Sequence, residues 1–137
     1  MDDIRLGIEL DTDRRAGGLP HLLPGDHAEG NVAITPRKDL RETSVEVRLR
    51  WRTEGRGESD GVVVVRSSSS PGPLSAGQLS LQPFSFRVPE GPWSFEGAVV
   101  RIVWQIEATV ATDGSTQETE LPVVIAPLER AGIAGPW

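Results

Sequence analysis

Three arginines alternate along one segment of the chain, in a pattern suited to binding anions. Arg48, Arg50 and Arg52 occupy every second position. Alternate side chains of a β-strand stand about 6.5–7 Å apart on one face, so the three guanidinium groups would form a basic stripe. A planar guanidinium binds a carboxylate or phosphate through paired hydrogen bonds, which predicts docking of an acidic or phosphorylated partner segment. The alternative is cross-strand ion pairing with glutamates: Glu107, Glu118 and Glu120.

Two tryptophans lie outside the alternating segments. Trp93 follows Pro92 in a predicted turn, where it either anchors a partner or folds back over the end of the sheets. We include Trp93 with the three arginines as a candidate partner-binding residue. Trp137 ends a tail, residues 128–137, that has no apolar pattern, and chain ends are the least ordered part of most domains. The alternative is that Gly135-Pro136-Trp137 docks on a partner.

The acidic residues and histidines do not form a recognisable metal-binding motif. Glu9-Leu10-Asp11-Thr12-Asp13 contains the Asp-x-Asp spacing that calcium loops use, but such a loop would place a further ligand where Arg15 stands. We interpret these acids as solvated residues at a strand end. A zinc site needs three or four ligands, and His21 and His27 have no third partner at a suitable spacing. We interpret both as loop histidines and expect no metal site.

No combination of residues indicates catalysis or a cofactor. The chain has no cysteine, which excludes disulfides, thiolate metal sites and a cysteine nucleophile. The serine run Ser67–Ser70 belongs to a predicted loop, where a nucleophile cannot be held within about 0.5 Å of a productive position. Neither a Gly-x-Ser-x-Gly elbow nor a phosphate-binding glycine loop is present. We expect a protein that is not an enzyme and binds no cofactor.

The charge of the chain restricts its partners. With 14 basic and 20 acidic residues, the 137-residue chain has a formal charge of −6. An acidic domain binds poorly to phosphate backbones and to anionic membrane surfaces. Met1–Arg5 carries acids where a signal peptide carries bases, and no run approaches the roughly 20 apolar residues of a membrane span. We expect a cytoplasmic, single-domain protein that binds another protein or itself.

Apolar residues alternate along the chain with a period of two. This is typical of β-strands with one buried face, whereas an amphipathic helix would space them three and four apart. The longest alternating segments are 4–11, 45–52, 100–110 and 116–125. Trp51 and Trp104 fall on the apolar parity and are predicted core residues. With the shorter candidates below, seven or eight strands and no helix indicate an all-β sandwich or barrel.

Three shorter segments complete the predicted sheets. Asn31–Ile34 and the proline-bearing Leu79–Val88 are expected to be edge strands, the latter with a bulge or an edge kink at Gln82-Pro83, where the apolar parity changes. The β-branched run in Gly61–Arg66 suits a strand covered on both faces. Two connections are predicted from turn residues: a long loop at Ser67–Gly77 and a type I′ hairpin turn at Asp113-Gly114.

The segment Leu79–Val110, LSLQPFSFRVPEGPWSFEGAVVRIVWQIEATV, resembles the second half of an arrestin amino-terminal domain. In that family an F-x-F-x-(L/V)-P strand leads through a P-x-S-x-x-G turn into a long strand of the form (V/I)-x-(W/Y)-x-(I/L)-x-A-x-(V/L). The matching residues are Phe84, Phe86, Pro89, Pro92, Ser94, Gly97, Ile102, Trp104, Ile106, Ala108 and Val110. Pro24-Gly25-Asp26 followed by Gly30-Asn31-Val32 is similar to the entry into the family's second strand.

The resemblance covers about residues 4–127. It implies an immunoglobulin-like, two-sheet antiparallel β-sandwich at residues 1–127, followed by the tail 128–137. It also implies a scaffold or cargo-adaptor role. Members of that family usually carry two such sandwiches, and this chain has the length of one. Two other functions stay open, which are a structural subunit of a homo- or hetero-oligomer and a carbohydrate- or calcium-binding sandwich module.

Overall fold

The computed structural model describes residues 4–55, 61–97 and 100–128, and the regular elements given there are β-strands. In chain order they are β1 (Ile4–Leu10), β2 (Arg15–Ala16), β3 (Leu19–Leu22), β4 (His27–Pro36), β5 (Ser44–Gly55), β6 (Gly61–Ser69), β7 (Ser80–Arg87), β8 (Phe95–Glu96), β9 (Val100–Ala111) and β10 (Thr116–Ile125). Of the predicted tail, Trp137 and the other residues after Leu128 lie outside the described residues.

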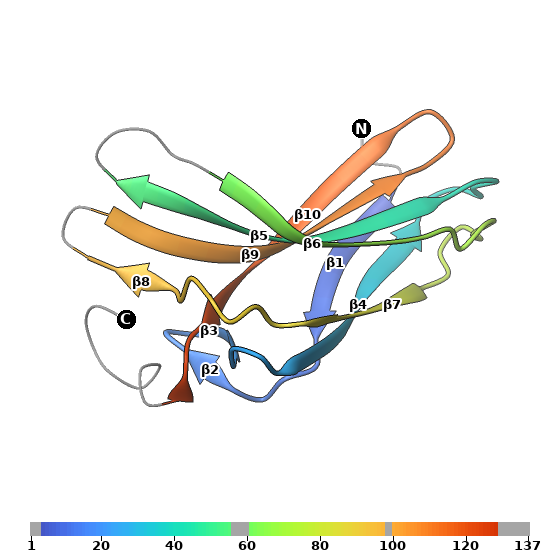
Figure 1. The fold of residues 1–137 in the computed structure, drawn as a ribbon. Coiled ribbons are helices and arrows are strands. Elements are labelled where there is room, and N and C mark those ends of the chain that lie inside the picture. The colour runs from blue at the N-terminus through green and yellow to red at the C-terminus, as the bar shows by residue number, and fades with distance from the viewer. Residues whose placement is uncertain (1–3, 56–60, 98–99, 129–137) are drawn as a thin grey trace.

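The strands form two sheets, which Figure 1 shows as two layers. The small sheet has the order β1-β4-β7, with both pairings antiparallel. The large sheet has the order β2-β3-β10-β9-β5-β6, and β8 pairs with β9. Among the described strands, only β3 and β10 pair in parallel. The predicted all-β sandwich of two largely antiparallel sheets is therefore confirmed.

The alternation in the sequence builds the core. In each long strand the apolar parity faces the opposite sheet, and burying these side chains is the main force that stabilises the fold. The buried side chains of the main cluster include Ile4, Val32, Ile34, Val45, Val47, Leu49, Phe84, Phe86, Val88, Trp104, Ile106, Val110, Val123 and Ile125. Both predicted core tryptophans pack here: Trp104 is fully buried, and Trp51 lies against it with ring centroids 6.5 Å apart.

The two open sides of the sandwich differ. On one side the Gln117 side chain of β10 binds both backbone groups of Ile4: its Oε1 accepts from the Ile4 N–H at 3.0 Å, and its Nε2 donates to the Ile4 carbonyl at 3.2 Å. These bonds tie β1 to the large sheet. On the other side β6 and β7 are the edge strands, and no strand within the described residues pairs with their outer edges.

The predicted edge strands need one correction each. Asn31–Ile34 is not an edge, because it belongs to β4, which lies between β1 and β7. β7 is an edge strand, as expected for a strand that contains Pro83, but it pairs with β4 without a register shift. The apolar parity changes there because Leu79 and Leu81 are 58% and 47% exposed, and no bulge is needed.

The prediction that Gly61–Arg66 is covered on both faces is wrong. This segment belongs to the edge strand β6, where Val62 and Val64 are 42% and 40% exposed. A register shift between Leu49 and Arg50 of β5 leaves Val64 without a paired residue, so a bulge lies on β6. A run of β-branched residues reports a preference for extended backbone and does not report burial.

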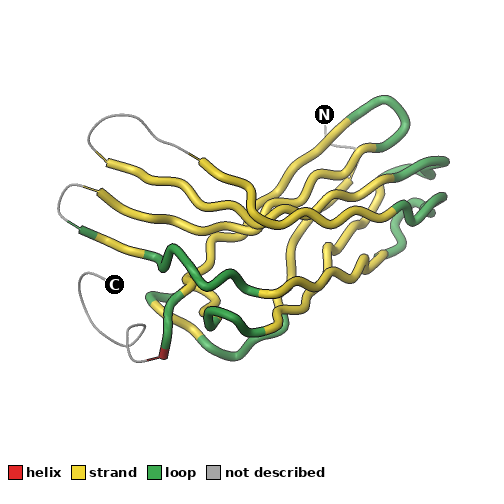
Figure 2. Tube along the Cα trace, viewed as in Figure 1, coloured by secondary structure: helices red, strands yellow, loops and turns green. Residues whose placement is uncertain are grey.

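Loops gather at the end of the sandwich that holds the β9–β10 hairpin (Figure 2). The hairpin at Asp113-Gly114 is present, but only Gly114 has a positive φ, 93°, so the turn is not type I′. The Asp113 carboxylate instead accepts hydrogen bonds from the N–H groups of Arg41 at 3.0 Å and Glu42 at 2.9 Å. β6 continues to Ser69, so the predicted long loop begins later than expected.

Gly30 is required where β4 passes beside Phe84. Its backbone pairs with Leu10 of β1 and with Phe84 of β7. A Cβ atom at this position would overlap the Glu9 carbonyl oxygen and lie 2.7 Å from Phe84 Cζ. Phe84 thus fills the space that the absent side chain leaves, and it stacks on Phe86 with ring centroids 6.1 Å apart.

Replacement of this glycine should therefore destabilise the small sheet. We expect Gly30→Ala to lower the free energy of unfolding by about 1–3 kcal/mol, because both the Glu9 backbone of β1 and the Phe84 ring have to move. Urea unfolding followed by tryptophan fluorescence measures the change. Gly7→Ala is the matched control, since no atom lies within 4 Å of a Cβ built there. An equal loss in both variants would contradict the explanation.

Candidate functional site

The outer face of the large sheet carries the predicted arginine stripe. Arg48 is its most enclosed member, with a side chain 13% exposed, compared with 38% for Arg50 and 30% for Arg52. Arg50 lies 3.4 Å from Glu107 of the neighbouring strand β9. Arg48 contacts three carboxylates: Glu46 at 2.7 Å, Glu107 at 3.2 Å and Glu118 at 3.3 Å.

A buried amide extends this network. Arg52 pairs with Glu54 of its own strand at 2.6 Å and donates to Gln105 Oε1 at 2.8 Å. Gln105 is 4% exposed, and its Nε2 donates to Glu107 and, at 3.1 Å, to Glu120. Polar side chains of β5, β9 and β10 are thus connected across the face.

The network lowers the pKa of two glutamates. Burial acts to raise the pKa of Glu107, but hydrogen bonds from Gln105 and Arg48, with the charges of Arg50 and Arg48, outweigh it, so this pKa is lowered. The hydrogen bond from Arg48 is the main cause of the lowered pKa of Glu46, and the charge of Arg66 adds to it. Both carboxyl groups are therefore held in the charged form.

The stripe is balanced by acids instead of being a free basic surface. The cross-strand ion pairs given above as the alternative are present for Glu107 and Glu118, both with Arg48. An incoming anion has to compete with these carboxylates. Arg66, at the edge of the same face, shares Glu46 at 3.2 Å and keeps its side chain 62% exposed, so it is accessible to a partner.

Trp93 lies in the segment that carries the chain from β7 to β8. It is 39% exposed, and its Nε1 donates to the Glu90 carbonyl at 3.0 Å. The next residue is firmly held, because Ser94 N–H donates to the Ile125 carbonyl at 2.8 Å and Ser94 Oγ accepts from Ile125 N–H at 3.0 Å. β9 separates this segment from β5, so the fold does not gather Trp93 and the arginines into one site.

The histidines lie in strands, which corrects their interpretation as loop residues. His21 of β3 is 2% exposed, and its Nε2–H donates to the Ala126 carbonyl at 2.6 Å. His27 begins β4 and lies 3.8 Å from Glu29. Within the described ranges, no group of three or more His, Cys, Asp or Glu side chains is placed to hold a metal ion. In the same part of the chain, no helix is long and apolar enough to cross a membrane.

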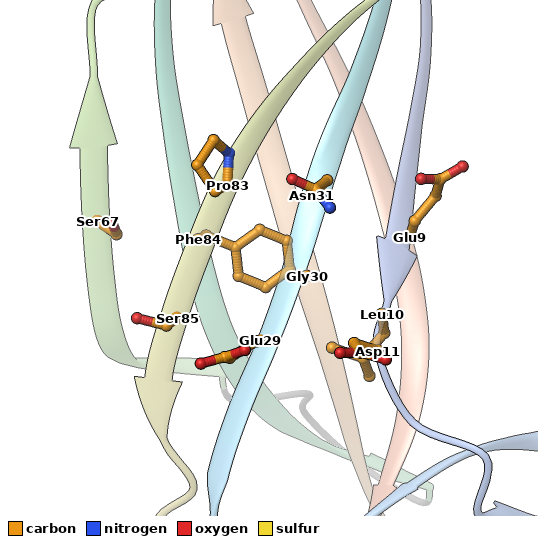
Figure 3. A pocket seen from close by; sticks show the side chains of 10 residues that line it. All are labelled: Glu9, Leu10, Asp11, Glu29, Gly30, Asn31, Ser67, Pro83, Phe84 and Ser85. Atoms are coloured by element: carbon orange, nitrogen blue, oxygen red, sulfur yellow. The ribbon is translucent and has the colours of Figure 1, made fainter.

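A shallow depression of about 770 Å³ is lined by residues from or next to the three strands of the small sheet and by Ser67 of β6, and it is not predicted by the sequence analysis. Figure 3 shows three acids among its lining residues: Glu9 and Asp11 from the end of β1, and Glu29 from β4. The antiparallel pairing of β1 with β4 brings them together, and the Asp11 N–H donates to the Glu29 carbonyl at 2.9 Å. The acids at this strand end thus form a negatively charged hollow with residues distant in sequence.

β6 combines a free edge with exposed apolar and basic side chains. Val62 and Val64 are exposed, as described above, and Arg66 follows them on the same strand. Edge strands present unpaired backbone donors and acceptors, and natural proteins either shield such edges or use them for binding. Nothing within the described residues shields this one with another strand.

Comparison with known proteins identifies the fold. No protein-family model and no curated protein matches the chain. The crystal structure of Spo0M, a sporulation control protein from Bacillus subtilis, is similar, with a TM-score of 0.71 and 12% sequence identity. The match covers 91% of this chain and 50% of that chain, so this chain spans about half the length of Spo0M. At this identity the likeness shows the fold, the arrestin-like β-sandwich expected from the sequence resemblance.

Removal of the central arginine tests whether the stripe is structural. We expect Arg48→Met to lower the free energy of unfolding by about 1–3 kcal/mol, because Glu107, whose side chain is 14% exposed, loses a hydrogen-bonded cation. Arg50→Met is the matched control and should cost less than about 1 kcal/mol, because Arg50 is 38% exposed and Arg48 still pairs with Glu107. Urea unfolding provides both values. Equally small effects would show that the network does not stabilise the fold.

The lowered pKa of Glu107 predicts a pH dependence. A carboxyl whose pKa is lower in the folded state contributes stability that is fully present above the ordinary value of 4.5 and is lost as the pH falls through the lowered value. Glu107→Gln removes this contribution. Below pH 4.5 the wild type should therefore lose stability more steeply than the variant, as measured by urea unfolding across the acidic range. Parallel profiles would contradict this assignment.

Proposed function

We propose that this domain is a protein-binding adaptor or scaffold module of the cytoplasm, without catalytic activity, that binds an extended partner segment along β6. The observation that carries the proposal is the free outer edge of β6, a strand that also carries the exposed side chains of Val62, Val64 and Arg66. The arrestin-like fold agrees with a binding role but does not define the partner.

Strand addition explains how this edge would recognise a partner. A segment that joins an edge strand gains main-chain hydrogen bonds along its length, and its alternating side chains provide the specificity. The exposed side chains of β6 are Val62, which pairs with Trp51 on the core parity, Val64 at the bulge, and Arg66, which pairs with Arg48 on the outer face. The preferred segment therefore combines apolar residues with an acidic one.

The ion pairs of the arginine stripe extend to this edge and help to position Arg66 there. Arg48 and Arg66 share the Glu46 carboxylate, at 2.7 Å and 3.2 Å, so the network holds Arg66 next to the free edge. An acidic partner residue would compete with Glu46 for Arg66. Direct docking of a partner on Arg48, Arg50 and Arg52 would require their ion pairs to open. That docking role, and the role of Trp93, stay predictions.

A peptide selection tests the edge. Random peptides of about 12 residues displayed on phage are selected on the wild type, and we expect enrichment of segments that alternate apolar and acidic residues. Val64→Asp should weaken binding of the enriched peptides by about tenfold or more in fluorescence anisotropy, because its carboxylate repels an acidic strand. Arg66→Gln should weaken binding mainly at low salt, where the charge is least screened.

Leu81→Asp is the matched control, because Leu81 has a similar exposure, 47%, on the other sheet. The proposal fails if Val64→Asp binds like the wild type, or if the control loses binding equally. The triple variant Arg48→Ser, Arg50→Ser, Arg52→Ser is measured alongside, at a temperature where it is folded. A salt-dependent loss in that variant that exceeds the loss in Arg66→Gln would place the partner directly on the stripe.

A further inference from the structure

We propose that the outer face of the small sheet is a self-association surface, on which a second copy of this chain packs about a two-fold axis. The face consists of the residues of β1, β4 and β7 that alternate with the core residues of those strands. This proposal does not rest on the proposed function, which concerns the edge of the other sheet.

Strand pairing arranges the face in rows that cross all three strands. Gly7, Ala33 and Leu81 form the central row, because Gly7 pairs with Ala33 and Ala33 pairs with Leu81. This row has one glycine, one alanine and a leucine that is 47% exposed, and the still more exposed Leu79 lies beside it. Because this row has no charge and two of its three residues have little or no side chain, a second sheet can approach it closely.

Charges of opposite sign flank the central row. On β1, Arg5 lies two residues before Gly7 and Glu9 lies two residues after it, so each is about 7 Å from the row. On β4, Glu29 lies on the acidic side, and the exposed Arg37 follows the strand on the basic side. The acidic depression of Figure 3 is therefore one end of a face whose other end is basic.

A two-fold axis across the strands, through the central row, makes this face complementary to itself. The rotation reverses the strand direction but leaves β1 over β1, so Arg5 of each copy lies over Glu9 of the other. It also brings Arg37 of each copy toward Glu29 of the other, and the Leu81 side chains of the two copies toward each other. Packed sheets cross at about 30°, which displaces side chains about 7 Å from the axis by about 3.5 Å, within reach of an arginine.

The charges distinguish this arrangement from the other two-fold axis in the plane of the face. An axis along the strands would place β1 over β7. Arg5 would then meet Leu79, and Glu9 would meet Pro83, so opposite charges would not meet. Charge complementarity therefore selects the antiparallel arrangement.

The size of the face sets the strength of the association. Three strands about 4.8 Å apart, over seven residues of about 3.4 Å each, give a projected area of about 340 Å² per copy. Stable complexes bury about 800 Å² per partner, so this dimer belongs to the weak, transient class. The oligomeric state should therefore depend on protein concentration.

Two charge reversals test the axis. Arg5→Glu puts like charges into both Arg5–Glu9 contacts of the dimer, and so does Glu9→Arg. Each variant alone should self-associate about tenfold more weakly than the wild type or worse. An equimolar mixture of the two restores opposite charges in both contacts and should associate like the wild type. Sedimentation equilibrium from about 10 μM to about 1 mM covers the range expected for a weak dimer.

Recovery on mixing would also show that both variants are folded. Leu81→Asp places like charges at the axis and should stay monomeric, whereas Val64→Asp on β6 should associate like the wild type. A wild type that stays monomeric throughout, or an Arg5→Glu variant that associates normally, overturns the proposal. Loss in Val64→Asp with retention in Leu81→Asp also overturns it, in favour of pairing through the β6 edge.

Discussion

The hydrogen bond from the buried Trp104 ring to the Pro92 carbonyl, 2.7 Å long, constrains the path of one connection between the two sheets. Trp104 has no exposed surface, and a buried N–H group without an acceptor would cost about 1–3 kcal/mol. The segment that crosses from β7 to the large sheet must therefore pass beside β9. There Ser94 pairs with Ile125, which fixes the end of β10 as well.

Once the core is fixed in this way, side-chain parity determines both outer faces, and the two faces differ in their electrostatics. On the large sheet, arginines and glutamates alternate across neighbouring strands, so charges such as Arg48 and Glu107 are satisfied within the chain. On the small sheet, Arg5 and Glu9 lie on opposite sides of an uncharged row and are separated along one strand. The ion pairs on the large sheet stabilise the fold. On the small sheet, the separated charges of Arg5 and Glu9 suit a partner that carries the opposite charges at matching positions.

The sequence predicts which side chains of a strand share a face, but it does not predict which residues of neighbouring strands pair. Alternation alone placed Trp104 in the core and Arg48, Arg50 and Arg52 on one outer face, and both predictions are confirmed. Burial of a β-branched run depends on which strand is the last in its sheet, and the sequence of Gly61–Arg66 does not contain that information. In the same way, the acidic depression needs β1 paired with β4, a contact between segments separated by a hairpin.

The free edges and the outer face of the small sheet are suited to different partners. Pro83 has no N–H group to offer along the edge of β7, whereas β6 contains no proline, so β6 is the better edge for strand addition. β6 carries Arg66 but no acid, so two copies joined through this edge would find no opposite charges on it. The face around Gly7 carries a positive and a negative side chain, Arg5 and Glu9, at equal distances from the proposed two-fold axis. Under the two proposals, an acidic partner segment and a second copy of this chain would therefore bind to different surfaces.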